Sequence, residues 1–121
     1  MKKFLNLIIL TFILTQSSFA QKYNSELISK KLELNFATTP KRGIDYNDII
    51  YYVENDLQTI SAYKGSKLKW QTNVISICGK PKNGNPEIRY VGYNTDKLLI
   101  VMGKHNFAEI DINNGITKLV G

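Results

Sequence analysis

The chain of 121 residues has very little of the residue types that build catalytic and metal sites. It contains one histidine, His105, and one cysteine, Cys78. Zinc sites take about three or four ligands from histidine, cysteine and carboxylate side chains, so we expect no metal site. A single cysteine cannot form an intrachain disulfide, which excludes a fold held together by such bridges. Walker and G-x-G-x-x-G phosphate loops are also absent, so we expect no nucleotide and no other cofactor.

Residues 1–20 have the three parts of a secretory signal peptide. A positively charged start precedes an apolar run at 4–14, and Ser18 and Ala20 supply small residues before a cleavage point. The run is shorter than the ~20 apolar residues of a membrane-spanning helix. We therefore expect cleavage near Ala20 and export of the remaining chain, either to the periplasm or outside the cell.

The rest of the chain consists mainly of short β-rich runs separated by turn residues, and no run of comparable length has a helical period. We expect strands at 31–37, 49–53, 57–62, 68–78, 87–93, 98–102, 106–112 and 116–120. The prediction is an all-β antiparallel meander of about eight strands. Residues 21–47 would form an N-terminal segment and linker, and residues 48–121 a β-repeat domain.

This β-repeat domain has an internal period of 50 residues. Three pairs of identical residues are related by the shift: Ile50 and Ile100, Ile60 and Ile110, and Gly65 and Gly115. A period of this length with about four strands in each unit is typical of propeller blades. Two blade-like four-stranded units could also cover one face of each other, so a small sandwich and a partial propeller both stay open.

An apolar strand at 50–53, a second strand at 57–62, Gly65 and then Trp70 follow one another in the first unit. This order, and the turn at 109–115, resemble the blade repeat of quinoprotein-type (PQQ-like) β-propellers over about half of the chain after the leader. The resemblance implies a blade-like β fold in which Trp70 docks between blades. Among members of that family, protein-interaction scaffolds fit a chain of about two blades better than cofactor-dependent dehydrogenases.

Aromatic and basic side chains in the predicted strands form the candidate binding surface. These residues are Tyr51, Tyr52, Tyr63, Trp70, Arg89, Tyr90 and Tyr93. Aromatic rings among positive charges can stack nucleic-acid bases, but an exported protein rarely meets nucleic acid. With a net charge of +6, we expect instead a protein partner, or an anionic surface glycan or lipid. Edge strands would offer a second mode, strand addition to a partner or to a second copy.

Cys78 and His105 are the candidate reactive groups. Such partners meet in space and not in sequence, so a nucleophilic pair stays open although no local signature marks one. The alternatives are a small buried thiol for Cys78 and a surface turn for His105. We assign no catalytic residue and expect a small exported, non-enzymatic binding or interaction module. A secreted hydrolase that uses Cys78 or His105, and a degenerate propeller fragment with no activity, are the other hypotheses.

Overall fold

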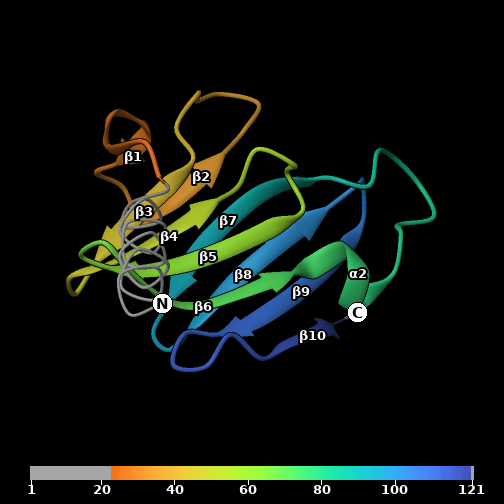
Figure 1. Cartoon of the computed structure of the whole chain (residues 1–121). Helices are drawn as coiled ribbons and strands as arrows, with labels where there is room; N and C mark the ends of the chain where they lie inside the picture. The colour runs from red at the N-terminus through yellow and green to blue at the C-terminus, as the bar shows by residue number, and fades with distance from the viewer. Residues whose placement is uncertain (1–22, 121) are drawn as a thin grey trace, which may run out of the picture.

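Ten strands form two five-stranded sheets in the computed structural model, which describes residues 23–120 (Figure 1). Sheet A contains, in spatial order, β1 (Ile28–Ser29), β3 (Gly43–Tyr46), β4 (Ile49–Val53), β5 (Thr59–Lys64) and β6 (Lys67–Asn73). Sheet B contains β10 (Thr117–Val120), β9 (Asn106–Asp111), β8 (Lys97–Met102), β7 (Ile88–Asn94) and β2 (Glu33–Asn35). Every pairing is antiparallel except that of β1 with β3. The prediction of an all-β chain is confirmed.

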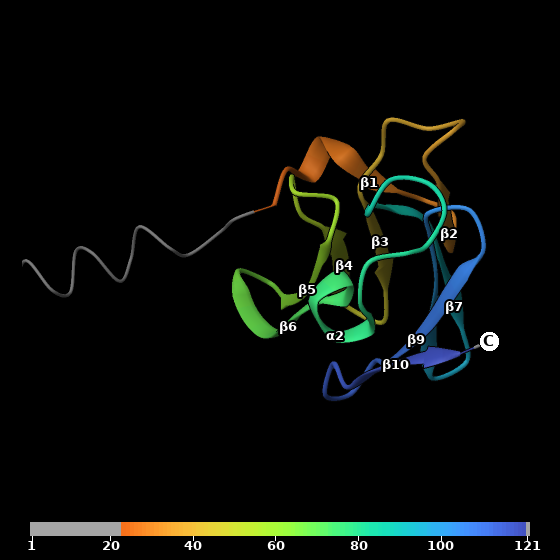
Figure 2. The same cartoon turned by 90° about the vertical axis from the view of Figure 1, so that its right-hand side faces the viewer.

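Each sheet contains a meander of four consecutive strands, β3–β6 in sheet A and β7–β10 in sheet B. Figure 2 shows the two meanders on opposite sides of the molecule, with the core between them. In the central strands, side chains that point inward are mainly apolar. The fully buried ones include Ile60, Val91, Leu98, Ile100 and Ile110. Burial of these side chains holds the two sheets face to face.

Residues 23–46 contribute to both sheets. A 3-10 turn, η1 (Ser25–Leu27), leads into β1 at one edge of sheet A, while β2 forms an edge of sheet B. Leu34 of β2 and Ile44 of β3 are completely buried. The stretch 21–47, which we expected to be a segment and linker, therefore supplies strands and core residues within its described part. The predicted signal peptide at 1–20 lies outside the described residues.

The predicted strand at 68–78 is wrong in its second half, where the chain forms the helix α2 (Val74–Cys78). The side-chain oxygen of Asn73 accepts a hydrogen bond from the Ser76 backbone N–H at 3.0 Å, which caps the first turn. Val74 and Ile75 are adjacent and both belong to the same core cluster, which a helix allows, whereas neighbours in a strand point to opposite faces. Within residues 23–120, no helix is long and apolar enough to span a membrane.

Trp70 of β6 joins the two meanders. Its indole Nε1 donates a hydrogen bond to the Ile112 carbonyl at 2.8 Å, across from sheet A to the turn between β9 and β10. Gly115 of that turn lies directly against the indole, since a Cβ atom there would be 2.7 Å from two ring atoms. Next to this contact, the hydroxyl groups of Thr72 and Thr117 are 2.9 Å apart. The edge strand β6 is thus linked to β10 and the turn before it by the Trp70 indole, which contacts Gly115, and by the hydroxyl pair of Thr72 and Thr117.

The close contact at Gly115 predicts a stability difference between two equivalent turns. Gly65 and Gly115 both have left-handed φ, +60° and +77°, but only Gly115 has atoms within 4 Å of an added Cβ. Gly65→Ala should lower the free energy of unfolding by about 1 kcal/mol through backbone strain alone. Gly115→Ala should lower it by about 2 kcal/mol more, because a methyl group must displace the indole.

Denaturant unfolding followed by Trp70 fluorescence measures both variants. Equal losses of stability in Gly65→Ala and Gly115→Ala would show that the indole contact does not constrain the turn.

Candidate functional site: an aromatic pocket between the sheets

Two of the predicted surface tyrosines, Tyr52 and Tyr63, are buried on the face of sheet A that points away from sheet B. They are 4% and 1% exposed. The Tyr23 ring covers them, with centroid distances of 6.0 Å to Tyr52 and 5.0 Å to Tyr63. The Tyr63 hydroxyl also donates to the Glu54 carboxylate at 3.0 Å. Contrary to our expectation, these two rings pack within the protein and are not open to a partner.

Arg89 and Tyr90 lie together on β7 but are held by contacts within the protein. The Arg89 guanidinium donates to the Lys104 carbonyl at 2.7 Å. The Tyr90 hydroxyl donates to the Glu33 carboxylate at 2.7 Å, and this hydrogen bond, together with burial, raises the pKa of Tyr90. The Tyr90 ring covers Gly92, where an added Cβ would lie 2.9 Å from the phenol oxygen.

The remaining three predicted residues, Tyr51, Trp70 and Tyr93, are brought together. The Tyr51 ring lies 6.2 Å from the ring of Trp70 and 6.0 Å from that of Tyr93. A fourth ring, Tyr46, lies 4.4 Å from Tyr93 and was not predicted. The four rings come from strands β3, β4, β6 and β7, so both sheets contribute to the cluster.

Three of these rings line a pocket of about 200 Å³, here called the aromatic pocket. Its lining residues are Asn47, Ile49, Tyr51, Ala62, Lys69, Trp70, Tyr93, Ile112 and Asn113. The turn between β3 and β4 places Asn47 there, with left-handed φ values of 53° at Asn47 and 63° at Asp48. Asn-Asp is a sequence typical of such a two-residue hairpin turn, and this signal could have identified β3. The turns β3–β4 and β9–β10 lie at the same end of the molecule, on the left in Figure 1.

The Tyr51 hydroxyl is the unusual polar group of the aromatic pocket. The residue is 3% exposed, and burial, with a smaller effect of Tyr93, raises the pKa of Tyr51 to about 12. Among residues 23–120 this hydroxyl has no hydrogen-bond partner. Every fully enclosed polar side-chain atom of the same residues has a partner, so the Tyr51 oxygen is not fully enclosed, and Tyr51 is a lining residue of the pocket. The Tyr93 hydroxyl differs, because it donates to the Thr95 carbonyl at 2.7 Å.

The charge of the aromatic pocket is positive. Lys69 is its one charged lining residue, and no carboxylate belongs to the lining. The pocket thus combines aromatic faces, a free phenol hydroxyl, two asparagines and an ammonium group. This set can bind a polar ring by stacking and hydrogen bonding, but it contains no activated nucleophile and no general base near neutral pH.

The candidate reactive groups lie on different elements. Cys78 ends α2, where it is half-buried and packs against the core, and burial raises the pKa of its thiol. His105 is exposed in the turn between β8 and β9. In the described part of the chain no hydrogen bond links them. Between residues 23 and 120 there is also no group of three or more metal-ligating side chains.

Comparison of the chain with models of known protein families, with curated proteins and with solved structures found no match.

The raised pKa of Tyr51 predicts a pH dependence of stability. A tyrosine in the unfolded chain ionises near pH 10, whereas Tyr51 in the folded protein ionises near 12. Between these values the unfolded state releases the proton first, so the contribution of Tyr51 to stability is complete below pH 10 and is lost as pH rises towards 12. Tyr51→Phe should flatten the fall in unfolding free energy between pH 9.5 and 11.5, measured by denaturant titration at roughly half-unit intervals.

Tyr63 has a similar pKa of about 12, so part of this pH dependence should persist in Tyr51→Phe. An identical fall in wild type and Tyr51→Phe would contradict the assignment.

The raised pKa of Cys78 predicts low thiol reactivity. The thiolate is the reactive form, so iodoacetamide should alkylate Cys78 more slowly in the native protein than in the urea-unfolded protein at the same pH. His105→Ala should leave the native rate unchanged. Faster alkylation in the native state, lost in His105→Ala, would instead support the hydrolase hypothesis.

Proposed function

We propose that the chain is a non-enzymatic binding module and that the aromatic pocket is its ligand site. The observation that carries this proposal is the Tyr51 hydroxyl, which lies on a buried ring and has no partner within the described protein. Because the Tyr51 oxygen is not fully enclosed, a ligand in the pocket can accept or donate a hydrogen bond there in place of solvent. Trp70 and Tyr93 hold flat apolar faces beside it.

The ligand chemistry that fits this pocket is that of a single sugar ring. A sugar ring presents C–H groups on one face, which pack on aromatic rings, and hydroxyl groups at its edge, which can bond the Tyr51 hydroxyl and asparagine amides. A volume of about 200 Å³ is smaller than the roughly 300–1,000 Å³ of pockets for drug-sized ligands. One ring at the end of a glycan therefore suits the pocket better than an internal segment of several rings.

Export and a blade-like arrangement belong to the same proposal. The signal-peptide pattern at 1–20 supports export, which would bring the module to surface glycans. The contact of Trp70 with the other meander supports two blade-like units, since a docking tryptophan is what the resemblance implies. Neither feature requires catalysis.

Trp70 makes the proposal directly testable, because it is the single tryptophan of the chain. Titration with glucose, galactose, N-acetylglucosamine and galacturonic acid should change its fluorescence saturably for at least one sugar. Tyr51→Phe should weaken that binding about 2- to 10-fold, the value of one hydrogen bond of 0.5–1.5 kcal/mol. The same variant should be as stable as wild type or more so at pH 7, since the lost hydroxyl has no protein partner among the described residues.

Tyr23→Phe is the matched control and should bind with wild-type affinity. A Tyr51→Phe protein that binds every sugar as tightly as wild type would overturn the proposal. So would the absence of any saturable Trp70 signal across the four sugars at millimolar concentration.

A further inference from the structure

A β-bulge interrupts strand β6 at the aromatic pocket. On the paired strand β5, Ala62 lies opposite Trp70 and Tyr63 lies opposite Leu68. Lys69 is therefore an extra residue on β6, with no residue of β5 opposite it. A bulge breaks the regular alternation of side chains along a strand and can re-aim one of them. At this position alternation does not decide on which face of sheet A the lysine lies.

The bulge brings Lys69 to the pocket. Lys69 and Trp70 are consecutive residues, yet both line it. On the unbulged strand β5, the neighbours Ala62 and Tyr63 lie on opposite faces, as in any regular strand. Ala62 belongs to the core and lines the pocket, whereas Tyr63 packs against Tyr23 on the outer face. Because a lysine side chain is long and flexible, the Lys69 ammonium group can reach a ligand in the pocket.

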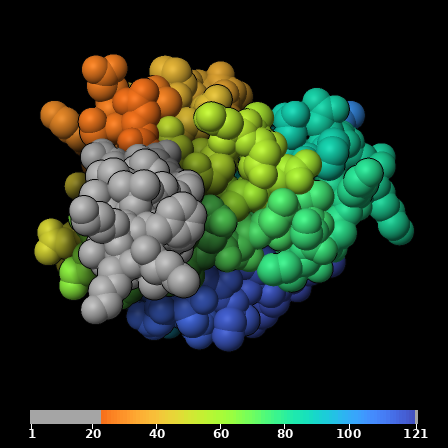
Figure 3. Space-filling model, viewed as in Figure 1, coloured from red at the N-terminus to blue at the C-terminus, as the bar shows by residue number. Residues whose placement is uncertain are grey.

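The neutral polar groups of the pocket come from two turns. Asn47 lies in the turn between β3 and β4, and Asn113 in the turn between β9 and β10. Each side-chain amide can both donate and accept hydrogen bonds. Figure 3 shows part of the junction between the sheets on the surface, where the green region of β6 and α2 borders the blue region of β10. Polar groups from both sheets therefore surround the rings.

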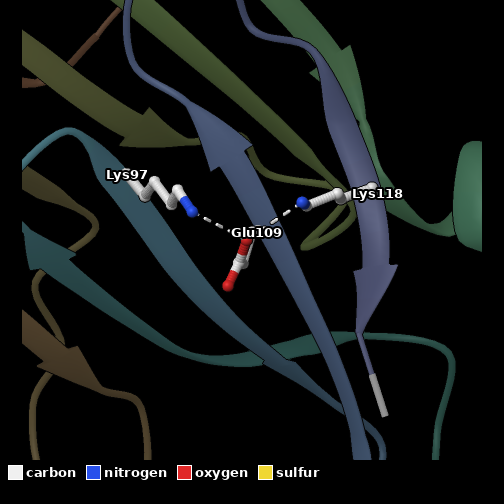
Figure 4. A network of polar contacts seen from close by, with 3 residues as sticks. All are labelled: Lys97, Glu109 and Lys118. Atoms are coloured by element: carbon white, nitrogen blue, oxygen red, sulfur yellow. Dashed lines mark ion pairs between the residues drawn. The ribbon is translucent and has the colours of Figure 1, made fainter.

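The charge of Lys69 is not balanced within the described protein. Among residues 23–120, the ion pairs are those of Glu109 with Lys97 at 3.4 Å and with Lys118 at 3.7 Å, all within sheet B (Figure 4). No carboxylate lines the aromatic pocket. An unpaired lysine on a surface is not a site by itself. Here it lies beside aromatic faces and the Tyr51 hydroxyl, in a pocket that can hold one ring.

We propose that Lys69 makes the aromatic pocket selective for a sugar ring that carries a carboxylate, such as a uronic acid at the end of a glycan. This inference rests on the proposed function and adds the chemical class of the ligand. A carboxylate replaces the hydroxymethyl group of a neutral hexose with little change in size, so a pocket of about 200 Å³ that accepts the hexose also accepts the acid. Lys69 pairs with the carboxylate, while the Tyr51 hydroxyl and the asparagine amides bind the ring hydroxyls.

The test titrates Trp70 fluorescence with glucuronic acid and galacturonic acid, each compared with its neutral methyl ester and with the corresponding hexose. At low salt, at least one acid should bind about 3- to 5-fold more tightly than its neutral counterparts, the effect of one partly exposed ion pair. Added salt should reduce this advantage, because dissolved ions screen the pair. Lys69→Gln removes the charge, so it should abolish the advantage and leave binding of the neutral hexose unchanged. Lys69→Arg should keep it.

Lys67→Gln is the matched control. Lys67 is also an exposed lysine of β6, two residues away, but it does not line the aromatic pocket. Its loss changes the net charge by the same amount, so Lys67→Gln should keep the preference for the acid.

The outcomes separate this inference from the proposed function. Equal binding of acid and methyl ester, or equal losses in Lys67→Gln and Lys69→Gln, would overturn the role of Lys69. The sugar site would still stand if the neutral hexose bound saturably and bound more weakly in Tyr51→Phe. If no sugar, acidic or neutral, changed Trp70 fluorescence, both the sugar site and its selectivity would be overturned.

Discussion

The contact between Trp70 and Gly115 is the constraint on which the rest of the structure depends. Two stacked sheets expose their edges, and here the indole of an edge strand in sheet A lies against a turn of sheet B. The hydrogen bond to the Ile112 carbonyl satisfies the indole N–H as its ring leaves solvent. Because the single cysteine of the chain cannot form an intrachain disulfide, packing contacts of this kind must fix how the sheets meet.

The same contact also creates the site. The indole that closes the edge forms a wall of the aromatic pocket, and Tyr51 lies between it and Tyr93. Tyr51 points inward from β4, so its ring belongs to the core while its hydroxyl reaches the pocket. In the proposed function, stability and recognition use different atoms of the Tyr51 side chain, so removal of the hydroxyl alone can separate them.

Local pattern was sufficient for much of the fold. Alternation located β4 at 49–53 without error, and β8 and β9 within one residue at each end. It also found β2, which lies within the predicted strand at 31–37. It missed β1 and β3, because strands of two and four residues are too short for a period to show. The repeat was only partly in phase. Ile60 and Ile110, which the repeat relates, are both in the core. The related pair Ile50 and Ile100 differs, because Ile50 lies opposite Tyr63 on the outer face of sheet A whereas Ile100 is buried. The cause is that the turn at 54–58 in the first unit is longer than the turn at 103–105 in the second.

The site was less accessible to sequence reasoning, for a physical reason. Alternation alone separates Tyr51 from Tyr52, since neighbours in a strand point to opposite faces. It does not say which face is the core, and it cannot bring Tyr51 to Trp70 and Tyr93, which come from three strands in two sheets. That proximity depends on the register of both meanders and on how the sheets stack, which are long-range properties of the chain. A residue of the candidate site is thus defined less by its own exposure than by where several strands end together.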